Sequence, residues 1–233
     1  MSSEIVYPAL VSEKGSLTKV EKQILGSFIM LSGASTILEL GAYKGVTTKF
    51  ICNFLKENNS SAKLFSFDVP DVVAVLEKDT ELLEFINSGQ LTFVSGYLPF
   101  TLKNWLLKYS QTIDIVLDDA LHDYKSVYEE VRLIWPRLST DGYILCHDYT
   151  DKYWGVIHAV NKFSRRYGTM NLSLHSSPTA ATGGFGSVLV VLRKQKFSIP
   201  IPMAAGLEWE RVKGFLVRTV LWKKLRPMLR RGK

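Results

Sequence analysis

The sequence predicts one α/β domain built on a doubly wound, mostly parallel sheet of seven strands with an antiparallel last strand. Short apolar runs alternate with amphipathic helical patterns five times along the chain. Units of this length need crossover connections, which make neighbouring strands parallel. The last two apolar runs have no helix between them, which predicts antiparallel pairing. The expected strands are 36–40, 64–67, 91–94, 113–117, 143–146, 172–174 and 188–192.

The expected helices follow the i, i+3/i+4 spacing of apolar residues. A lead-in helix is predicted over 16–33 and a basic amphipathic helix over about 207–229. The chain therefore divides into a helical lead-in (1–33), a central α/β domain (34–194) and a linker with the terminal helix (195–233). Within the central domain the expected helices span 46–57, 72–86, 102–109, 126–138 and 156–167.

The composition favours one sizeable core and no membrane span. The 233 residues are 46% hydrophobic and 22% charged, which is enough for one core. No apolar run approaches the roughly 20 residues that a span requires, and the N-terminus lacks the layout of a signal peptide. We therefore expect a cytoplasmic protein. Cys52 and Cys146 are too few for a disulfide framework and lack zinc-ligand spacing, so both are expected to be buried thiols.

The net charge of +7 belongs to the end of the chain, because residues 195–233 carry ten Lys/Arg against two Asp/Glu. A basic face without aromatic residues on an exposed sheet argues against nucleic acid. Three roles for the terminal helix stay open: peripheral contact with an anionic membrane surface, packing onto the core, or contact with a second subunit in a homo-oligomer.

The first strand-to-helix turn has the features of a ligand loop. In a doubly wound sheet, ligands bind beyond the carboxyl ends of the strands, where the strand order reverses. Here the turn reads Glu39-Leu-Gly-Ala-Tyr-Lys-Gly45. Gly41 permits a tight turn against a ligand, and Gly45 opens the next helix with free N–H groups. A dinucleotide site is expected to show three glycines instead.

Two carboxylates indicate which ligand the turn prefers. Glu39 would repel a pyrophosphate but suits the amino group of an amino acid moiety. Asp68 ends the second strand, where a ribose needs an acceptor for its hydroxyls. Together they favour a nucleoside that carries an amino acid. Structural roles, as a helix N-terminal acid for Glu39 and a turn residue for Asp68, stay open.

Two acids and two histidines follow the fourth and fifth strands. The first exit reads Asp119-Ala-Leu-His122 and the second begins His147-Asp148. Because the two strands should be neighbours, these side chains should converge beside the ligand. His122 titrates near neutral pH and can take a proton from a hydroxyl, while a carboxylate-bound divalent cation could lower that hydroxyl's pKa. Capping roles for both histidines stay open, and Trp154 is placed to border a substrate.

The turn at Gly41 resembles motif I of the class I S-adenosylmethionine-dependent methyltransferases, whose fold is Rossmann-like. Asp68 matches the acidic residue that this family carries after its second strand. The third strand exit, at Gly96 and Tyr97, resembles the position where the family lines the adenine ring. The resemblance implies S-adenosylmethionine as cofactor, bound by Glu39, Gly41, Ala42, Tyr43, Gly45, Asp68, Gly96, Tyr97 and Asp119.

The Asp119-x-x-His122-x-Tyr exit and the later His147-Asp148-Tyr resemble methyltransferases related to macrolide sugar and cephalosporin-type O-methyltransferases. This resemblance covers about 35–194. It implies methylation of a hydroxyl on a small molecule, natural product or sugar, with His122 and Asp119 as catalytic residues and His122 as the general base. It also implies Mg²⁺ on Asp119 and Asp148. His147 stands where some relatives have a third carboxylate ligand, and imidazole is a poor ligand for Mg²⁺.

Two other functions stay open. A nicotinamide-dependent oxidoreductase would share the sheet, but it should show the three-glycine loop and a catalytic Tyr-Lys or Ser-Tyr pairing, neither of which is identifiable here. A non-catalytic, membrane-associated binding protein would keep the fold without the chemistry. The acceptor is not specified by the sequence, because folds of this kind host many reactions.

Overall fold

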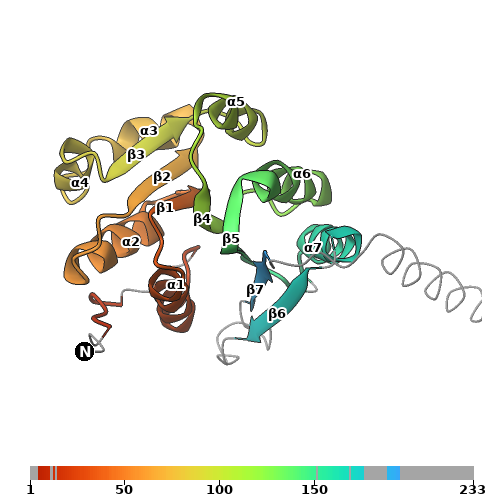
Figure 1. The fold of residues 1–233 in the computed structure, drawn as a ribbon. Coiled ribbons are helices and arrows are strands. Elements are labelled where there is room, and N and C mark those ends of the chain that lie inside the picture. Colours follow the sequence, from red (N-terminus) through yellow and green to blue (C-terminus); the bar gives the residue numbers. More distant parts are fainter. Residues whose placement is uncertain are drawn as a thin grey trace, which may run out of the picture.

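The computed structural model describes residues 5–10, 13, 15–150, 152–167, 169–175 and 188–194. They form a seven-stranded sheet in the order β3-β2-β1-β4-β5-β7-β6, with helices on both faces (Figure 1). The strands are β1 (Thr36–Leu40), β2 (Lys63–Asp68), β3 (Leu91–Ser95), β4 (Ile113–Asp118), β5 (Leu138–Cys146), β6 (Met170–His175) and β7 (Val188–Arg193). The helices are α1 (Lys19–Ser32), α2 (Val46–Glu57), α3 (Pro70–Leu76), α4 (Leu83–Asn87), α5 (Phe100–Lys108), α6 (Tyr124–Ile134) and α7 (Trp154–Tyr167).

The five strands β1 to β5 run parallel, and β7 is inserted antiparallel between β5 and β6. The predicted antiparallel pairing of the last two strands is confirmed. The strand order reverses between β1 and β4, from which the chain winds outward in both directions. The loops that follow these two strands therefore diverge and leave a crevice between them.

Neighbouring residues of each strand face two separate apolar cores, as the period of two in a β-strand requires. In β1, Ile37 packs in the core under α1, α2, α3 and α4, whereas Leu38 packs in the core under α5, α6 and α7. Both side chains are fully buried. The same alternation turns Glu39 toward α2, and this orientation matters for the site.

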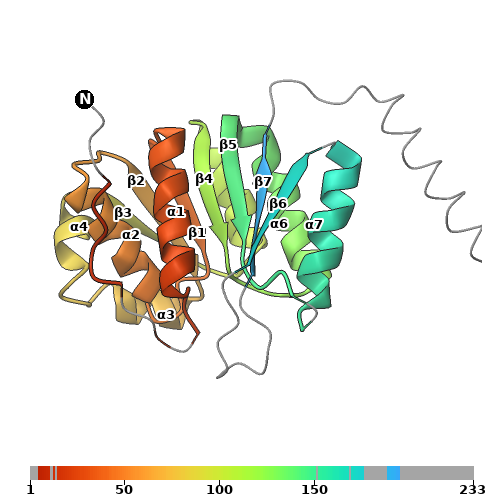
Figure 2. The same ribbon diagram turned by 90° about the horizontal axis from the view of Figure 1, so that it is seen from below.

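The lead-in helix α1 is part of the core and lies across one face of the sheet (Figure 2). Leu25 and Ile29 on it are buried against this face. The helix begins at Lys19, later than the predicted 16–33 span, because Thr18 caps it: the Thr18 hydroxyl accepts from Glu21 N–H, and the Glu21 carboxylate accepts from Thr18 N–H. This reciprocal pair satisfies two backbone donors that the helix itself cannot.

Other bounds differ from those predicted for local reasons. The single helix expected over 72–86 is two helices, α3 and α4, because the Asp79 carboxylate accepts from Glu81 N–H and turns the chain between them. The helix expected over 126–138 ends at Ile134 and continues as a 3₁₀ turn with Pro136, which leads directly into a longer β5 than predicted. The expected terminal helix over 207–229 lies outside the described residues. No helix within the described ranges is long and apolar enough to cross a membrane.

Candidate active site

A cavity of about 1270 Å³ opens at the carboxyl ends of β1, β2, β4 and β5, where the strand order reverses. Its volume exceeds the roughly 300–1,000 Å³ of common ligand sites, so it has room for a nucleoside and a second molecule. Every residue proposed from the sequence lines this cavity except three, Glu39, Gly45 and Trp154. The lining members of that set are Gly41, Ala42, Tyr43, Asp68, Gly96, Tyr97, Asp119, His122, His147 and Asp148.

The turn after β1 is held by backbone contacts to both neighbouring strands. Gly41 N–H donates to Phe67 O at 2.9 Å, and Asp119 N–H donates to Leu40 O at 2.9 Å. Gly41 has φ +92°, and a Cβ there would lie 2.5 Å from the carbonyl oxygen of Asp119. Glycine is thus required both by the backbone angle and by the close approach of the β4 exit.

Gly45 serves packing rather than the cavity wall. It is the N-cap of α2, at φ +73°, and a Cβ there would lie 2.7 Å from Leu76 Cδ2. Gly45 thus opens α2, as predicted, and also allows α3 to pack closely against the start of that helix.

Asp68 lies on the cavity wall with its carboxylate held in place. Its Oδ2 accepts from Tyr43 N–H at 2.7 Å, and its Oδ1 accepts from Val69 N–H at 2.6 Å. Each carboxylate oxygen has a second lone pair. The group can consequently accept further hydrogen bonds from a pair of hydroxyls without moving.

Glu39 lies beneath the turn instead of on the wall, so the direct contact predicted between its carboxylate and a ligand is not present in this geometry. The side chain is fully buried, and its Oε2 accepts from Thr48 Oγ1 at 2.7 Å and from Ser66 Oγ at 2.6 Å. Oε1 has no hydrogen-bond partner among the described residues. Burial raises the pKa of Glu39 to about 7, although the two hydroxyls oppose the shift.

Because of this raised pKa, ionisation of Glu39 lowers the free energy of unfolding as pH rises. A carboxyl whose pKa is higher in the folded than in the unfolded protein stabilises the folded state fully below about pH 4.5. This contribution is lost as pH rises through about 7. Glu39→Gln should therefore gain about 2 to 3 kcal/mol in unfolding free energy, relative to wild type, between pH 5 and pH 8. Urea denaturation at both pH values measures the change, and Glu57→Gln, at the exposed end of α2, should show none. Parallel pH profiles for Glu39→Gln and wild type would contradict the assignment.

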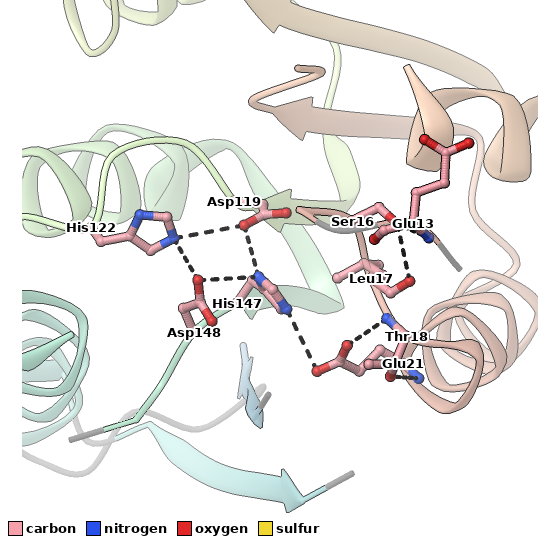
Figure 3. Close-up of polar contacts among 9 residues, drawn as sticks. All are labelled: Glu13, Ser16, Leu17, Thr18, Glu21, Asp119, His122, His147 and Asp148. Atoms are coloured by element: carbon pink, nitrogen blue, oxygen red, sulfur yellow. Dashed lines mark hydrogen bonds and ion pairs between the residues drawn. The ribbon is translucent and has the colours of Figure 1, made fainter. Parts of the chain in front are cut away.

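Asp119, His122, His147 and Asp148 form a compact cluster beside the turn. One ligand atom from each lies within 4.8 Å of the others, and Figure 3 shows the four side chains pointing toward one another. His147 Nδ1 is 2.8 Å from Asp119 Oδ1, and His122 Nε2 is 2.9 Å from Asp148 Oδ2. The predicted convergence of the β4 and β5 exits is thus observed.

The acids and histidines of the cluster shift one another's pKa values. The carboxylates of Asp119 and Asp148 raise the pKa of His122 to about 9. Burial lowers the pKa of His147, but Asp119 and Glu21 outweigh it and raise that pKa well above its ordinary value. Burial likewise opposes ionisation of Asp119, yet His147 and His122 hold its pKa below its ordinary range. The carboxylates therefore favour the protonated form of both imidazoles, and the pKa of His122 lies above the near-neutral value expected from the sequence.

Backbone geometry and ring packing orient these side chains. Asp148 adopts a left-handed φ of 56°, an uncommon conformation for a non-glycine residue that costs of order 1 kcal/mol or more. It lies two residues after the end of β5, and its carboxylate faces His122. The ring of Tyr153 stacks on His122 with centroids 4.4 Å apart. Tyr153 also lines the cavity, whereas Trp154, expected to border the substrate, is 62% exposed and does not line it.

A buried acid pair supports the cluster from below. Asp118 points into the core under α6, where its carboxyl faces that of Glu130. Burial raises the pKa of both groups, and the neighbouring Asp118 carboxyl raises that of Glu130 further, to about 10, which favours the protonated form of Glu130. The Asp118 carbonyl in turn accepts from His147 N–H at 2.9 Å, which joins the two strand exits.

Sequence reasoning missed the contribution of the N-terminal segment. Gly15 and Ser16 line the cavity, and the Glu21 carboxylate reaches His147. The only local signal was the Thr18-x-x-Glu21 capping pattern, which predicts where a helix begins but not what the helix contacts.

Comparisons with known proteins agree with this geometry. Residues 38–149, just under half of the chain, match the family model described as "Methyltransferase domain". No protein with a curated description matches the sequence.

Solved structures of methyltransferases share the fold at low sequence identity. An O-methyltransferase from Bacillus cereus in complex with SAH superposes with a TM-score of 0.62 at 10% identity, covering 78% of this chain and 84% of that one. The O-methyltransferase TomG from Streptomyces achromogenes, involved in tomaymycin synthesis and bound to SAM, gives 0.61 at 13% identity, covering 80% and 92%. An SAH-bound methyltransferase from Podospora anserina gives 0.55 at 19%, covering 78% and 81%. Over residues 38–149 the chain thus carries the sequence pattern of a methyltransferase domain, within a fold that methyltransferases of known structure share.

Proposed function

We propose that the protein transfers the methyl group of S-adenosylmethionine to a hydroxyl of a small molecule, natural product or sugar. The observation that carries this proposal is a single cavity in which the Gly41 turn and Asp68 face the Asp119–His122–Asp148 cluster. One side of the cavity suits the nucleoside, and the other offers groups that handle a proton. Methyl transfer to oxygen needs both in one place.

The cofactor half follows from acceptors already in position. Asp68 presents a fixed carboxylate to a ribose hydroxyl pair, while Gly96 and Tyr97 border the region that an adenine ring would occupy. The Asp68 carboxylate on the wall favours a cationic ligand, whereas the imidazoles of His122 and His147 balance the charge of Asp119 and Asp148. The buried Glu39 supports the turn from below and adds negative charge when it is ionised.

On the other side of the cavity, His122 is the proposed general base. Because its pKa is about 9 beside two carboxylates, the ring must first release its own proton before it can accept one from the acceptor hydroxyl. A cationic ligand that pairs with Asp119 and Asp148 competes with the imidazolium for them, and so lowers the pKa of His122 toward its ordinary value. Asp119 holds the site together through its contacts to both imidazoles.

The carboxylates of Asp119 and Asp148 suit Mg²⁺, which binds through one or two carboxylates and several waters. The two histidines do not suit it, because His147 Nδ1 already bonds Asp119 and nitrogen is a poor ligand for this ion. Bound to these two residues, Mg²⁺ would lower the pKa of the acceptor hydroxyl and orient it.

Calorimetric titration with S-adenosylhomocysteine and, separately, with NADH tests the cofactor assignment. We expect saturable binding of the former alone, and Asp68→Asn should weaken it about 10- to 100-fold, since a hydrogen bond to a charged acceptor contributes about 1.5–3 kcal/mol. Asp71→Asn, on the exposed first turn of α3, is the matched control and should bind like wild type.

Incubation with labelled methyl donor and candidate acceptors, followed by mass spectrometry for a gain of one methylene, tests the transfer itself. Binding of NADH in place of the nucleoside would support an oxidoreductase. Binding of S-adenosylhomocysteine without transfer to any acceptor would support a binding protein on the same fold.

A further inference from the structure

The first turn of α1 contacts the cluster of Asp119, His122, His147 and Asp148 through the His147 ring. Glu21, in the first turn of α1, is fully buried, and its Oε1 lies 3.5 Å from His147 Nε2 (Figure 3). On the far side of the same ring, Nδ1 lies 2.8 Å from Asp119 Oδ1. The imidazole of His147 is thus held between a carboxylate of α1 and a carboxylate of the β4 exit.

The two oxygens of Glu21 have different partners. While Oε1 faces the ring, Oε2 accepts from Thr18 N–H at 2.8 Å, and Thr18 Oγ1 accepts from Glu21 N–H at 3.3 Å. The capping box therefore fixes the χ angles of Glu21, and with them the point from which the carboxylate meets His147. A carboxylate without such a second anchor would lose side-chain entropy to hold one contact.

The segment just before α1 touches the opposite end of the site. Ser16 and Gly15 line the cavity, and a Cβ on Gly15 would lie 3.1 Å from Tyr43 Cε1 on the cofactor turn. Residues 15–21 consequently connect the cofactor turn to the ring of His147. A helix that served only as packing would need neither contact.

We infer that Glu21 is a positioning residue of the active site: it orients the His147 ring, and through that ring the carboxylate of Asp119, toward the cavity. Glu21 does not line the cavity, so its effect on the site passes through the imidazole that it contacts. The helix α1 is accordingly an integral part of the site. The catalytic consequence rests on the proposed methyl transfer, but the orientation of the ring does not.

The variant Glu21→Gln separates the two contacts of the carboxylate, one with Thr18 N–H and one with the His147 ring. Thr18 N–H and the ring face different oxygens of Glu21, and glutamine carries an oxygen at only one of these two positions, so it can accept at Thr18 or at the ring but not at both. Thr18→Ala is the matched control, because it removes the other half of the capping box, at about 1 kcal/mol, and leaves the Glu21 contact to His147. Both variants weaken the start of α1, whereas only the first alters the partner of the ring.

Long-range ¹H–¹⁵N spectra of the ring nitrogens in the ¹⁵N-labelled full chain provide the readout, with His147 assigned by its absence in His147→Gln. We expect its signals to move in Glu21→Gln and to stay in Thr18→Ala. If Glu21→Gln does not fold, Glu21→Asp, shorter by one methylene, should move them as well. Unmoved signals in either Glu21 variant, or an equal shift in Thr18→Ala, would overturn the inference.

Kinetics with labelled methyl donor then test the catalytic consequence. Loss of a group that orients a metal-bound imidazole typically lowers activity about 10- to 100-fold, and we expect a loss of the same order in kcat here, with the KM for the cofactor unchanged. Shifted signals in a protein that transfers no methyl group would retain the positioning role and reject the proposed function. Full activity with shifted signals would show that the orientation of the His147 ring by Glu21 does not matter for catalysis.

Discussion

Replacing His122 by glutamine is expected to lower kcat for methyl transfer by about 100- to 10,000-fold, the range of a lost general base. Glutamine is close to histidine in size and keeps a polar group near Asp148, but it cannot accept a proton. The effect should fall on kcat, because His122 contacts carboxylates and Tyr153 rather than the Gly41 turn. Single-turnover assays with labelled S-adenosylmethionine and an identified acceptor measure it.

His158→Gln is the control for this prediction. His158 is exposed on α7 and packs against Trp154, with ring centroids 5.6 Å apart, so its loss should leave kcat unchanged. Removal of divalent ions with a chelator adds an independent arm: a fall in kcat restored by Mg²⁺ supports a metal at Asp119 and Asp148. If His122→Gln kept full activity with an authentic acceptor, His122 would not be the base, although the fold and cofactor assignments would stand.

Gly41→Ala is expected to destabilise the protein by about 3 kcal/mol or more and to abolish binding of S-adenosylhomocysteine. The left-handed φ of +92° alone costs about 1–3 kcal/mol for alanine, and forcing a methyl into packed surroundings costs about as much again. The methyl would lie 2.5 Å from Asp119 O and 2.9 Å from Ala120 Cα. Both neighbours are backbone atoms at the β4 exit, so the turn itself must move and distort the cavity wall.

Gly33→Ala separates the two causes. Gly33 also has a left-handed φ, +58°, at the C-cap of α1, but a Cβ there would meet nothing within 4 Å. It should therefore cost about 1–2 kcal/mol from backbone strain and leave nucleoside binding intact. Urea denaturation and calorimetry on both variants measure the two effects. Wild-type affinity in a folded Gly41→Ala protein would show that the turn is not the cofactor site.

Local patterns predicted the strands well and the helix ends less well. The alternation of apolar runs located all the sheet strands, because burial on both faces requires apolar residues whatever the tertiary context. Helix ends depend on single residues: side-chain hydrogen bonds of Thr18 and Asp79 decided two of them, and Pro136, which lacks a backbone N–H, lies at a third. Periodicity alone does not register such contacts.

The sequence by itself determined the parallel α/β order and the positions of the polar strand exits, since residues that end neighbouring parallel strands must meet at one edge of the sheet. Only the tertiary structure decided how these groups interact. It turned Glu39 beneath the Gly41 turn, surrounded both histidines with carboxylates that raise their pKa values, and brought Glu21 from α1 against His147. The physical reason is that pKa values and through-space contacts depend on burial and on distances between residues far apart along the chain, which no local pattern encodes.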